Sequence, residues 1–145
     1  MNRRIIGFDF GLKRIGAATG SERTGTAQAL DSISAKDGEP QWDSLDVVIR
    51  EWQPELLLVG LPLTLEGAET SISSRAKVFA TTLGKRFKLP VVLVDERLSS
   101  NEADHLITES AQKGKSRSRI RQKKRDSLAA ELIIRTYLND NRTPV

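Results

Sequence analysis

The hydrophobic pattern of the first third of the chain predicts three strands and then a helix. After Arg4, the segment 4–10 is apolar on both sides of an extended chain except at Asp9, which is typical of a central strand buried on both faces. Residues 15–19 resume a strand pattern and a third strand falls within 24–33, so we expect an antiparallel β-hairpin opening. Residues 42–52 repeat large apolar side chains every three or four positions, which predicts an amphipathic helix with its tryptophans in the core.

The rest of the chain alternates between strand and helix patterns. Short apolar runs at 55–60 and 91–94 predict strands, and the segments 73–87, 99–109 and 126–138 predict helices. Strands that alternate with helices are typical of parallel pairing through crossovers. We therefore expect the α/β class, with a mixed sheet of about five strands, three antiparallel and then parallel, flanked by helices.

Composition and length narrow the class further. The chain has 145 residues, which fits one domain with one core, and it has no cysteine, which excludes disulfides and thiolate metal sites. The longest apolar run, 56–63, is far shorter than the roughly 20 residues that a membrane-spanning helix needs. We expect a cytoplasmic protein without a membrane partner, as a monomer or a weak homodimer.

Charge is concentrated in one segment. The net charge of the chain is +4, and one acid-free stretch within a predicted loop at about 111–125 holds eight basic residues. The rest of the chain has 15 Lys and Arg against 19 Asp and Glu, so its net charge is −4. Such a segment indicates binding to a polyanion, with nucleic acid as the leading partner, since neutralised phosphates release counterions. The alternative is a solvated loop that aids solubility. The eight residues are Lys113, Lys115, Arg117, Arg119, Arg121, Lys123, Lys124 and Arg125.

Acidic residues stand at positions where a carboxylate is costly or well placed for chemistry. Asp9 lies within an apolar strand and needs a cation, either Lys13 or Arg14 returning across the hairpin or a metal ion. Asp95 and Glu96 end a strand at its carboxyl end, where open α/β sheets bind ligands, and strand alternation turns them to opposite faces. The pattern alone leaves open which of the two joins a site.

The last predicted helix begins with another acid, Asp126. By itself this residue is read as a helix N-cap. Three carboxylates from distant positions together form a hard-oxygen site that suits Mg²⁺ or Mn²⁺, and such sites serve phosphoryl chemistry.

Four short motifs, in order, cover nearly the whole chain: 9–16 (DFGLKRIG), 59–62 (VGLP), 95–97 (DER) and 126–130 (DSLAA). Together they resemble the YqgF family of bacterial RNase H-like proteins, also described as Holliday junction resolvases. The resemblance implies one RNase H-like domain over 1–145, a cytoplasmic location, and a metal-dependent nuclease that matures the 5′ end of precursor 16S ribosomal RNA. By analogy the catalytic and metal-binding acids are Asp9, Glu96 and Asp126.

The same resemblance adds motif positions that can contact phosphates. Arg14 and Arg97 match motif positions, and with Lys13 they join the basic segment as expected nucleic-acid contacts, the alternative being surface ion pairs. Two other functions remain open: a Holliday junction resolvase acting on branched DNA, and a non-catalytic RNA-binding assembly factor, for which backbone attraction alone is sufficient.

Overall fold

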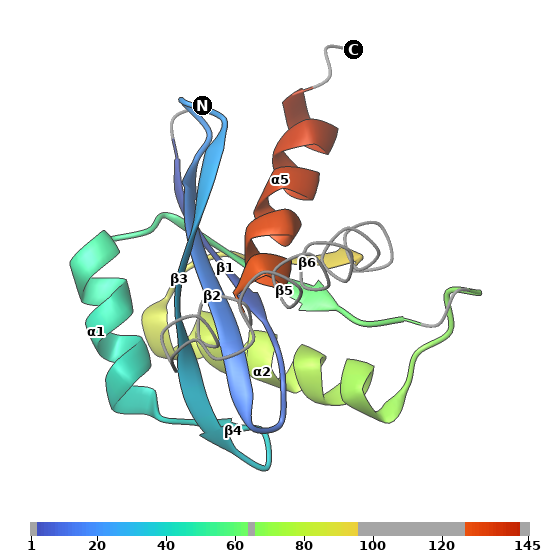
Figure 1. Ribbon diagram of the computed structural model, residues 1–145. Coiled ribbons are helices and arrows are strands. Elements are labelled where there is room, and N and C mark those ends of the chain that lie inside the picture. Colours follow the sequence, from blue (N-terminus) through green and yellow to red (C-terminus); the bar gives the residue numbers. More distant parts are fainter. Residues whose placement is uncertain (1–2, 64–65, 96–126, 143–145) are drawn as a thin grey trace, which may run out of the picture.

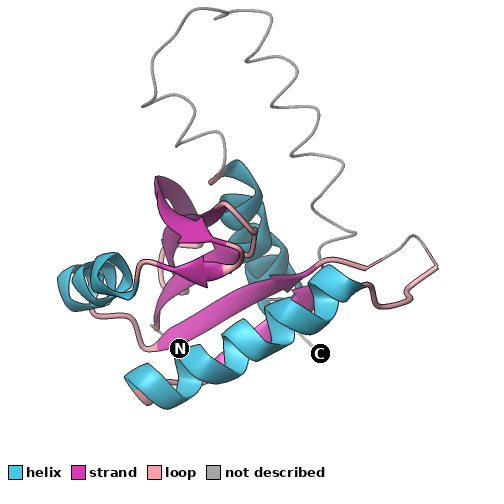
Figure 2. Ribbon diagram, turned by 90° about the horizontal axis from the view of Figure 1, so that it is seen from below, coloured by secondary structure: helices cyan, strands magenta, loops and turns pink. Residues whose placement is uncertain are grey.

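A mixed sheet with helices on both faces forms the centre of the molecule. The computed structural model describes residues 3–63, 66–95 and 127–142. Within them, six strands follow the order β4-β3-β2-β1-β5-β6, with α1 and α2 on one face and α5 on the other (Figure 1, Figure 2). The strands are β1 (Arg4–Asp9), β2 (Arg14–Ser21), β3 (Thr26–Lys36), β4 (Glu39–Pro40), β5 (Leu56–Leu61) and β6 (Val91–Asp95); the helices are α1 (Trp42–Trp52), α2 (Ser71–Phe87) and α5 (Leu128–Arg142).

The expected topology is confirmed. Strands β1, β2 and β3 pair antiparallel, and β1, β5 and β6 pair parallel through helical crossovers. Helix α2 begins two residues earlier than the pattern predicts, because Thr70 and Ser73 form a capping box with both reciprocal hydrogen bonds. The helix expected at 99–109 lies outside the described residues. No helix in the described part of the chain has the length and apolar character to cross a membrane.

One strand was not expected from the sequence. Asp37 and Gly38 both have positive φ, 50° and 83°, so the chain reverses tightly after β3. The next two residues pair back on β3 as β4. The described sheet therefore has six strands instead of about five, and the start of α1 follows directly from this turn.

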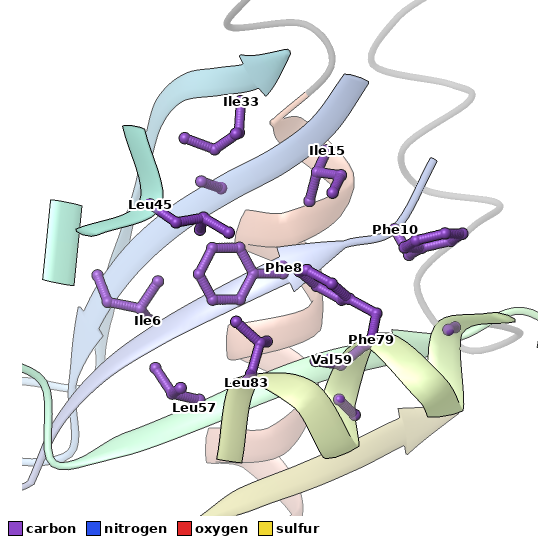
Figure 3. Close-up of a cluster of buried hydrophobic side chains, with 13 residues drawn as sticks. Ile6, Phe8, Phe10, Ile15, Ile33, Leu45, Leu57, Val59, Phe79 and Leu83 are labelled. Atoms are coloured by element: carbon purple, nitrogen blue, oxygen red, sulfur yellow. The ribbon is translucent and has the colours of Figure 1, made fainter. Parts of the chain in front are cut away.

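The larger apolar cluster lies between the sheet and helices α1 and α2 (Figure 3). Phe8 of β1 meets Phe79 of α2 edge to face, with ring centroids 5.8 Å apart and an interplanar angle of 86°. Leu45 of α1 and Leu83 of α2 are fully buried beside them. Trp42 and Trp52 pack on this cluster but remain half-buried, so their predicted core position is confirmed only in part.

A second cluster lies between the sheet and α5, which approaches the strands very closely. A Cβ atom at Gly7 would stand 2.8 Å from Cγ1 of Ile134 and 3.3 Å from the carbonyl oxygen of Ala130. A Cβ atom at Gly20 would stand 2.8 Å from Cγ2 of the same isoleucine. The helix can sit at this depth because β1 and β2 carry no side chain at these two points.

A polar network closes the other end of the α5 interface. The Arg3 guanidinium donates to both carboxylate oxygens of Glu22, at 2.9 and 3.2 Å, and to the hydroxyl of Tyr137 at 3.1 Å. The hydrogen bond from Arg3 holds the pKa of Glu22 below its usual range. The residue before β1, the residue after β2 and helix α5 are thereby joined by one charge-assisted set of contacts.

We expect Gly7→Val to lower the free energy of unfolding by about 1–3 kcal/mol, because the new side chain overlaps Ile134 and the carbonyl oxygen of Ala130. Urea denaturation monitored by far-UV circular dichroism measures this change. The matched control is Gly84→Ala in α2, where the nearest atom to a new Cβ is 3.5 Å away and a gain of about 0.5–1 kcal/mol is expected from helix propensity. Equal stability of Gly7→Val and the parent would contradict the close packing.

Candidate active site

Asp9 ends β1 on the face of the sheet that α5 covers. Ile5 and Gly7, which share its side of the strand by alternation, both contact the α5 cluster. Asp9 is half-buried, and its register partner on β2 is Gly16, which lacks a side chain. The carboxylate therefore stands at the carboxyl end of the central strand, on the side where α5 begins.

Ser127 fixes the start of α5 next to that strand end. Its side chain is fully buried, and its Oγ accepts a hydrogen bond of 3.1 Å from the backbone N–H of Ala17. Ala17 lies on β2 directly after Gly16, the partner of Asp9. The start of the helix is thus attached to β2 one residue away from the position opposite Asp9.

The structure describes the start of α5 only from Ser127 onward, so the N-cap prediction for Asp126 lies outside the described residues. The carbonyl oxygen of Ser127 accepts a helical hydrogen bond, 3.0 Å from the backbone N–H of Glu131. Its hydroxyl is used for the bond to β2, so this end of the helix is held by a tertiary contact. The sequence signal, a serine directly after Asp126 at the start of an apolar helix, was present but was not singled out.

Strand β6 settles which face Asp95 occupies. Val92 and Val94 pack against the α5 cluster, whereas Val91 packs against the cluster of α1 and α2. Asp95 shares the side of Val91 by alternation, and its register partner Leu61 lies likewise on that side of β5. Asp95 and Asp9 therefore lie on opposite faces of the sheet, so Asp95 does not belong to a site built around Asp9.

The structure describes only part of the predicted site. Asp9, Lys13 and Arg14 are described, and the two cations are exposed at the turn that follows β1 and at the first residue of β2. The remaining predicted residues lie outside the described residues: Glu96, Arg97, Lys113, Lys115, Arg117, Arg119, Arg121, Lys123, Lys124, Arg125 and Asp126. Among residues 3–63, 66–95 and 127–142, no group of three potential metal ligands occurs. Asp9 is a suitable hard oxygen ligand for Mg²⁺ or Mn²⁺.

Replacing Ser127 by Ala leaves the buried N–H of Ala17 without its acceptor, so the free energy of unfolding should fall by about 1–3 kcal/mol. Ser71→Ala, an exposed serine at the first residue of α2, is the matched control and should change stability little. Chemical denaturation of both variants measures the difference. If the two serines prove equivalent, Ser127 does not anchor α5.

Comparison with known proteins places nearly the whole chain in one family of sequences. A family model described as "RuvX: Holliday junction resolvase" matches residues 3–140. A protein of Actinobacillus pleuropneumoniae serotype 5b (strain L20) named "Putative pre-16S rRNA nuclease" is 47% identical over 137 residues, which cover 94% of this chain and 97% of the relative. A relative of the same name from Saccharophagus degradans is 42% identical and covers 94% and 93%.

Solved structures agree on the fold. A Thermus thermophilus RuvC in complex with a Holliday junction substrate superposes with a TM-score of 0.56 at 15% sequence identity, covering 97% of each chain. The fowlpox virus resolvase in complex with Holliday junction DNA gives a TM-score of 0.54 at 11% identity, covering 97% of this chain and 99% of the viral one. These likenesses show the RNase H-like fold that the mixed sheet predicts.

Proposed function

This chain belongs to the RuvX family, and from that premise we propose that it is a nuclease that hydrolyses phosphodiester bonds at the 5′ end of precursor 16S ribosomal RNA. Family membership confirms the resemblance predicted from the four motifs. The name shared by relatives at 42% and 47% identity supports the ribosomal RNA substrate. The observation that carries the proposal is the position of Asp9, at the carboxyl end of the central strand beside the attached start of α5.

We assign the acidic site to Asp9, Glu96 and Asp126, with Mg²⁺ or Mn²⁺ as the ion. The position of Ser127 supports this choice, because Asp126 directly precedes Ser127 in the sequence. The hydroxyl of Ser127 accepts a hydrogen bond from Ala17, the residue after the β2 partner of Asp9. Asp95 lies on the face of the sheet opposite to Asp9, and successive residues of a strand alternate between faces. This alternation supports the choice of Glu96, the next residue, as the acid of the site. A bound divalent ion supplies the acidified water and the stabilisation of the leaving oxygen that phosphodiester hydrolysis needs.

Basic residues hold the substrate strand in this proposal. Lys13 and Arg14 are exposed close to the end of β1, where a phosphate next to the scissile bond would lie. Arg97 and the basic segment of 113–125 add a cationic stretch whose attraction to phosphates is independent of base sequence. The protein then takes its substrate preference from the shape of the RNA as well as from charge.

Branched DNA is the second candidate substrate. The family model is described as a Holliday junction resolvase, and two of the structural neighbours were solved with junction DNA. Paired cutting of a junction requires two active sites related by symmetry, so this activity would depend on a dimer. A scaffold function without cleavage is the remaining outcome of the experiment below.

Asp9→Asn should abolish metal-dependent cleavage, because the amide keeps the shape of the carboxylate but loses its charge as an ion ligand. The matched control is Asp95→Asn, which changes an acid on the opposite face and should retain at least half of the parent rate. The measurement compares labelled precursor 16S RNA with a DNA four-way junction, each with Mg²⁺, Mn²⁺ or a chelator.

Each pattern of cleavage has one meaning. Cutting of the RNA by the parent and by Asp95→Asn, but not by Asp9→Asn, supports the proposal. Cleavage of the four-way junction but not of the RNA would show that branched DNA is the substrate. Binding without cutting under every condition rejects the nuclease, and equal loss in both variants rejects the placement of the site on the α5 face.

Replacing Lys123, Lys124 and Arg125 by glutamine should weaken the salt dependence of RNA binding. The slope of log K against log salt concentration should become less steep by about 2, the value expected for three lost phosphate contacts on a single strand. Fluorescence anisotropy with a labelled RNA at several salt concentrations measures this slope. A triple variant of Arg50, Lys85 and Lys88, exposed around the ends of α1 and α2, serves as the control and should leave the slope unchanged. An unaltered slope in the first variant would remove the basic segment from the interface.

A further inference from the structure

A pocket of about 410 Å³ lies on the face of the sheet opposite to Asp9. It is bounded by α2, by the first residue of α1 and by the turn between β3 and β4, and three aromatic rings contribute to its lining: Phe10, Trp42 and Phe79. Phe10 stands at the outer end of the apolar cluster in Figure 3, with its ring centroid 5.5 Å from that of Phe79. The pocket is thus an opening at the edge of the core, with aromatic walls.

The tight turn of Asp37 and Gly38 forms one wall of the pocket in a fixed position. A Cβ atom at Gly38 would stand 2.7 Å from a guanidinium nitrogen of Arg75 and 3.0 Å from the ring of Phe10. The Arg75 guanidinium donates to the carbonyl oxygen of Asp37 and, at 3.2 Å, to its carboxylate. Glycine at this point brings the turn against both residues, so the wall is formed before any ligand binds.

A second arginine holds the far end of the pocket. Arg86 lies eleven residues after Arg75 on α2, about 16 Å along the helix at 1.5 Å per residue. Its guanidinium donates to both oxygens of Asp46, at 3.0 and 2.8 Å, and lies 4.9 Å from the centroid of the Trp42 ring. The hydrogen bond from Arg86 also holds the pKa of Asp46 below its usual range.

The polar rim of the pocket carries both hydrogen-bond donors and acceptors. The indole N–H of Trp42 donates to Glu39 at 2.7 Å, and Ser74 and Thr82 bring hydroxyl groups from α2. Both guanidinium groups are already paired with carboxylates, so the pocket offers no uncompensated positive charge for a phosphate. Phe10 and Phe79 are buried and show only their edges at the pocket, whereas Trp42 is half-buried under the Arg86 guanidinium. This aromatic and guanidinium surface, together with the mixed polar rim, fits a planar heterocycle with a polar edge.

The pocket is continuous with the proposed cleavage site through the backbone of β1. Phe10 follows Asp9 directly, and alternation sends the two side chains to opposite faces of the same strand end. A nucleic-acid strand bound at Asp9 would reach the pocket by passing around this end of the sheet. The turn after β1 joins both, because the carbonyl oxygen of Leu12 accepts from the N–H of Gly38 at 2.8 Å.

We propose that this pocket binds one unpaired base of the strand whose phosphodiester bond lies at Asp9. The inference rests on the proposed function, since that strand is what brings a base to the pocket. Stacking and edge contacts there would set the distance between the cleaved bond and the extruded base, and so would contribute to the choice of cleavage position. A site that reads an unpaired base favours single-stranded or frayed ends over continuous duplex.

A substitution at Val78 tests whether a base binds in the pocket. The side chain of Val78 lines the pocket and is 66% exposed on α2, so Val78→Asp adds a carboxylate to the site without changing the core or the helix propensity. Val47→Asp on α1 is the matched control, because Val47 is 52% exposed and is not among the residues that line the pocket. Circular dichroism and thermal melting establish that both variants fold as the parent does.

The probe is a set of single-stranded RNA oligonucleotides of the precursor 5′ region, each with one abasic nucleotide at a different position. Affinity is measured in chelator, where no cleavage occurs, so the result is independent of the nuclease activity. For the parent and Val47→Asp we expect one position at which loss of the base weakens binding about tenfold, the size of one base stack. In Val78→Asp this penalty should disappear, since the base no longer enters the pocket.

Two results overturn the proposal. One is an abasic series in which no position is penalised in the parent, and the other is a penalty that persists undiminished in Val78→Asp. A pocket that serves a protein partner instead would give the first of these. Failure of Asp9→Asn to reduce cleavage would reject the nuclease proposal alone, because the binding measurements do not depend on it.

Discussion

The close contact between α5 and strands β1 and β2 is the constraint on which the rest of the structure depends. The contact is possible because Gly7 and Gly20 leave the sheet surface bare where Ile134 enters. Any side chain at Gly7 would have to displace Ile134 or the backbone of the helix at Ala130. A helix held further out could not bring Ser127 within hydrogen-bond distance of β2, so the depth of packing also fixes the start of α5.

The position of the proposed site follows from this packing. Asp9 is a costly carboxylate at the end of an apolar strand, and the sheet places it on the face where α5 begins. The opposite face carries the aromatic cluster of Phe8, Phe10 and Phe79, which ends in an open pocket. The end of β1 therefore presents an acidic group to one face and, at the next residue, an aromatic group to the other, which would link the proposed cleavage site to the proposed base pocket.

Much of this arrangement was predictable from local pattern. Alternation and apolar runs indicated β1, β5 and β6, and the spacing of Leu45 and Ile49 indicated α1, because both signals depend only on neighbours along the chain. The pattern did not find β4, since a strand of two residues has no period to detect. It also did not reveal the contact between Ser127 and β2, because that hydrogen bond joins residues 110 positions apart in sequence.

The fold class, the concentration of positive charge and the candidate acids could be read from the chain alone, since these depend on composition and on periods of two and 3.6 residues. The four motifs also indicated the family, which the family model confirms. The folded chain was needed to show that Asp95 faces away from Asp9, and that Phe10, Trp42 and Arg75 line a pocket. The physical reason is that the face of a strand and the depth of a helix are set by long-range packing, which brings together residues that no local period relates.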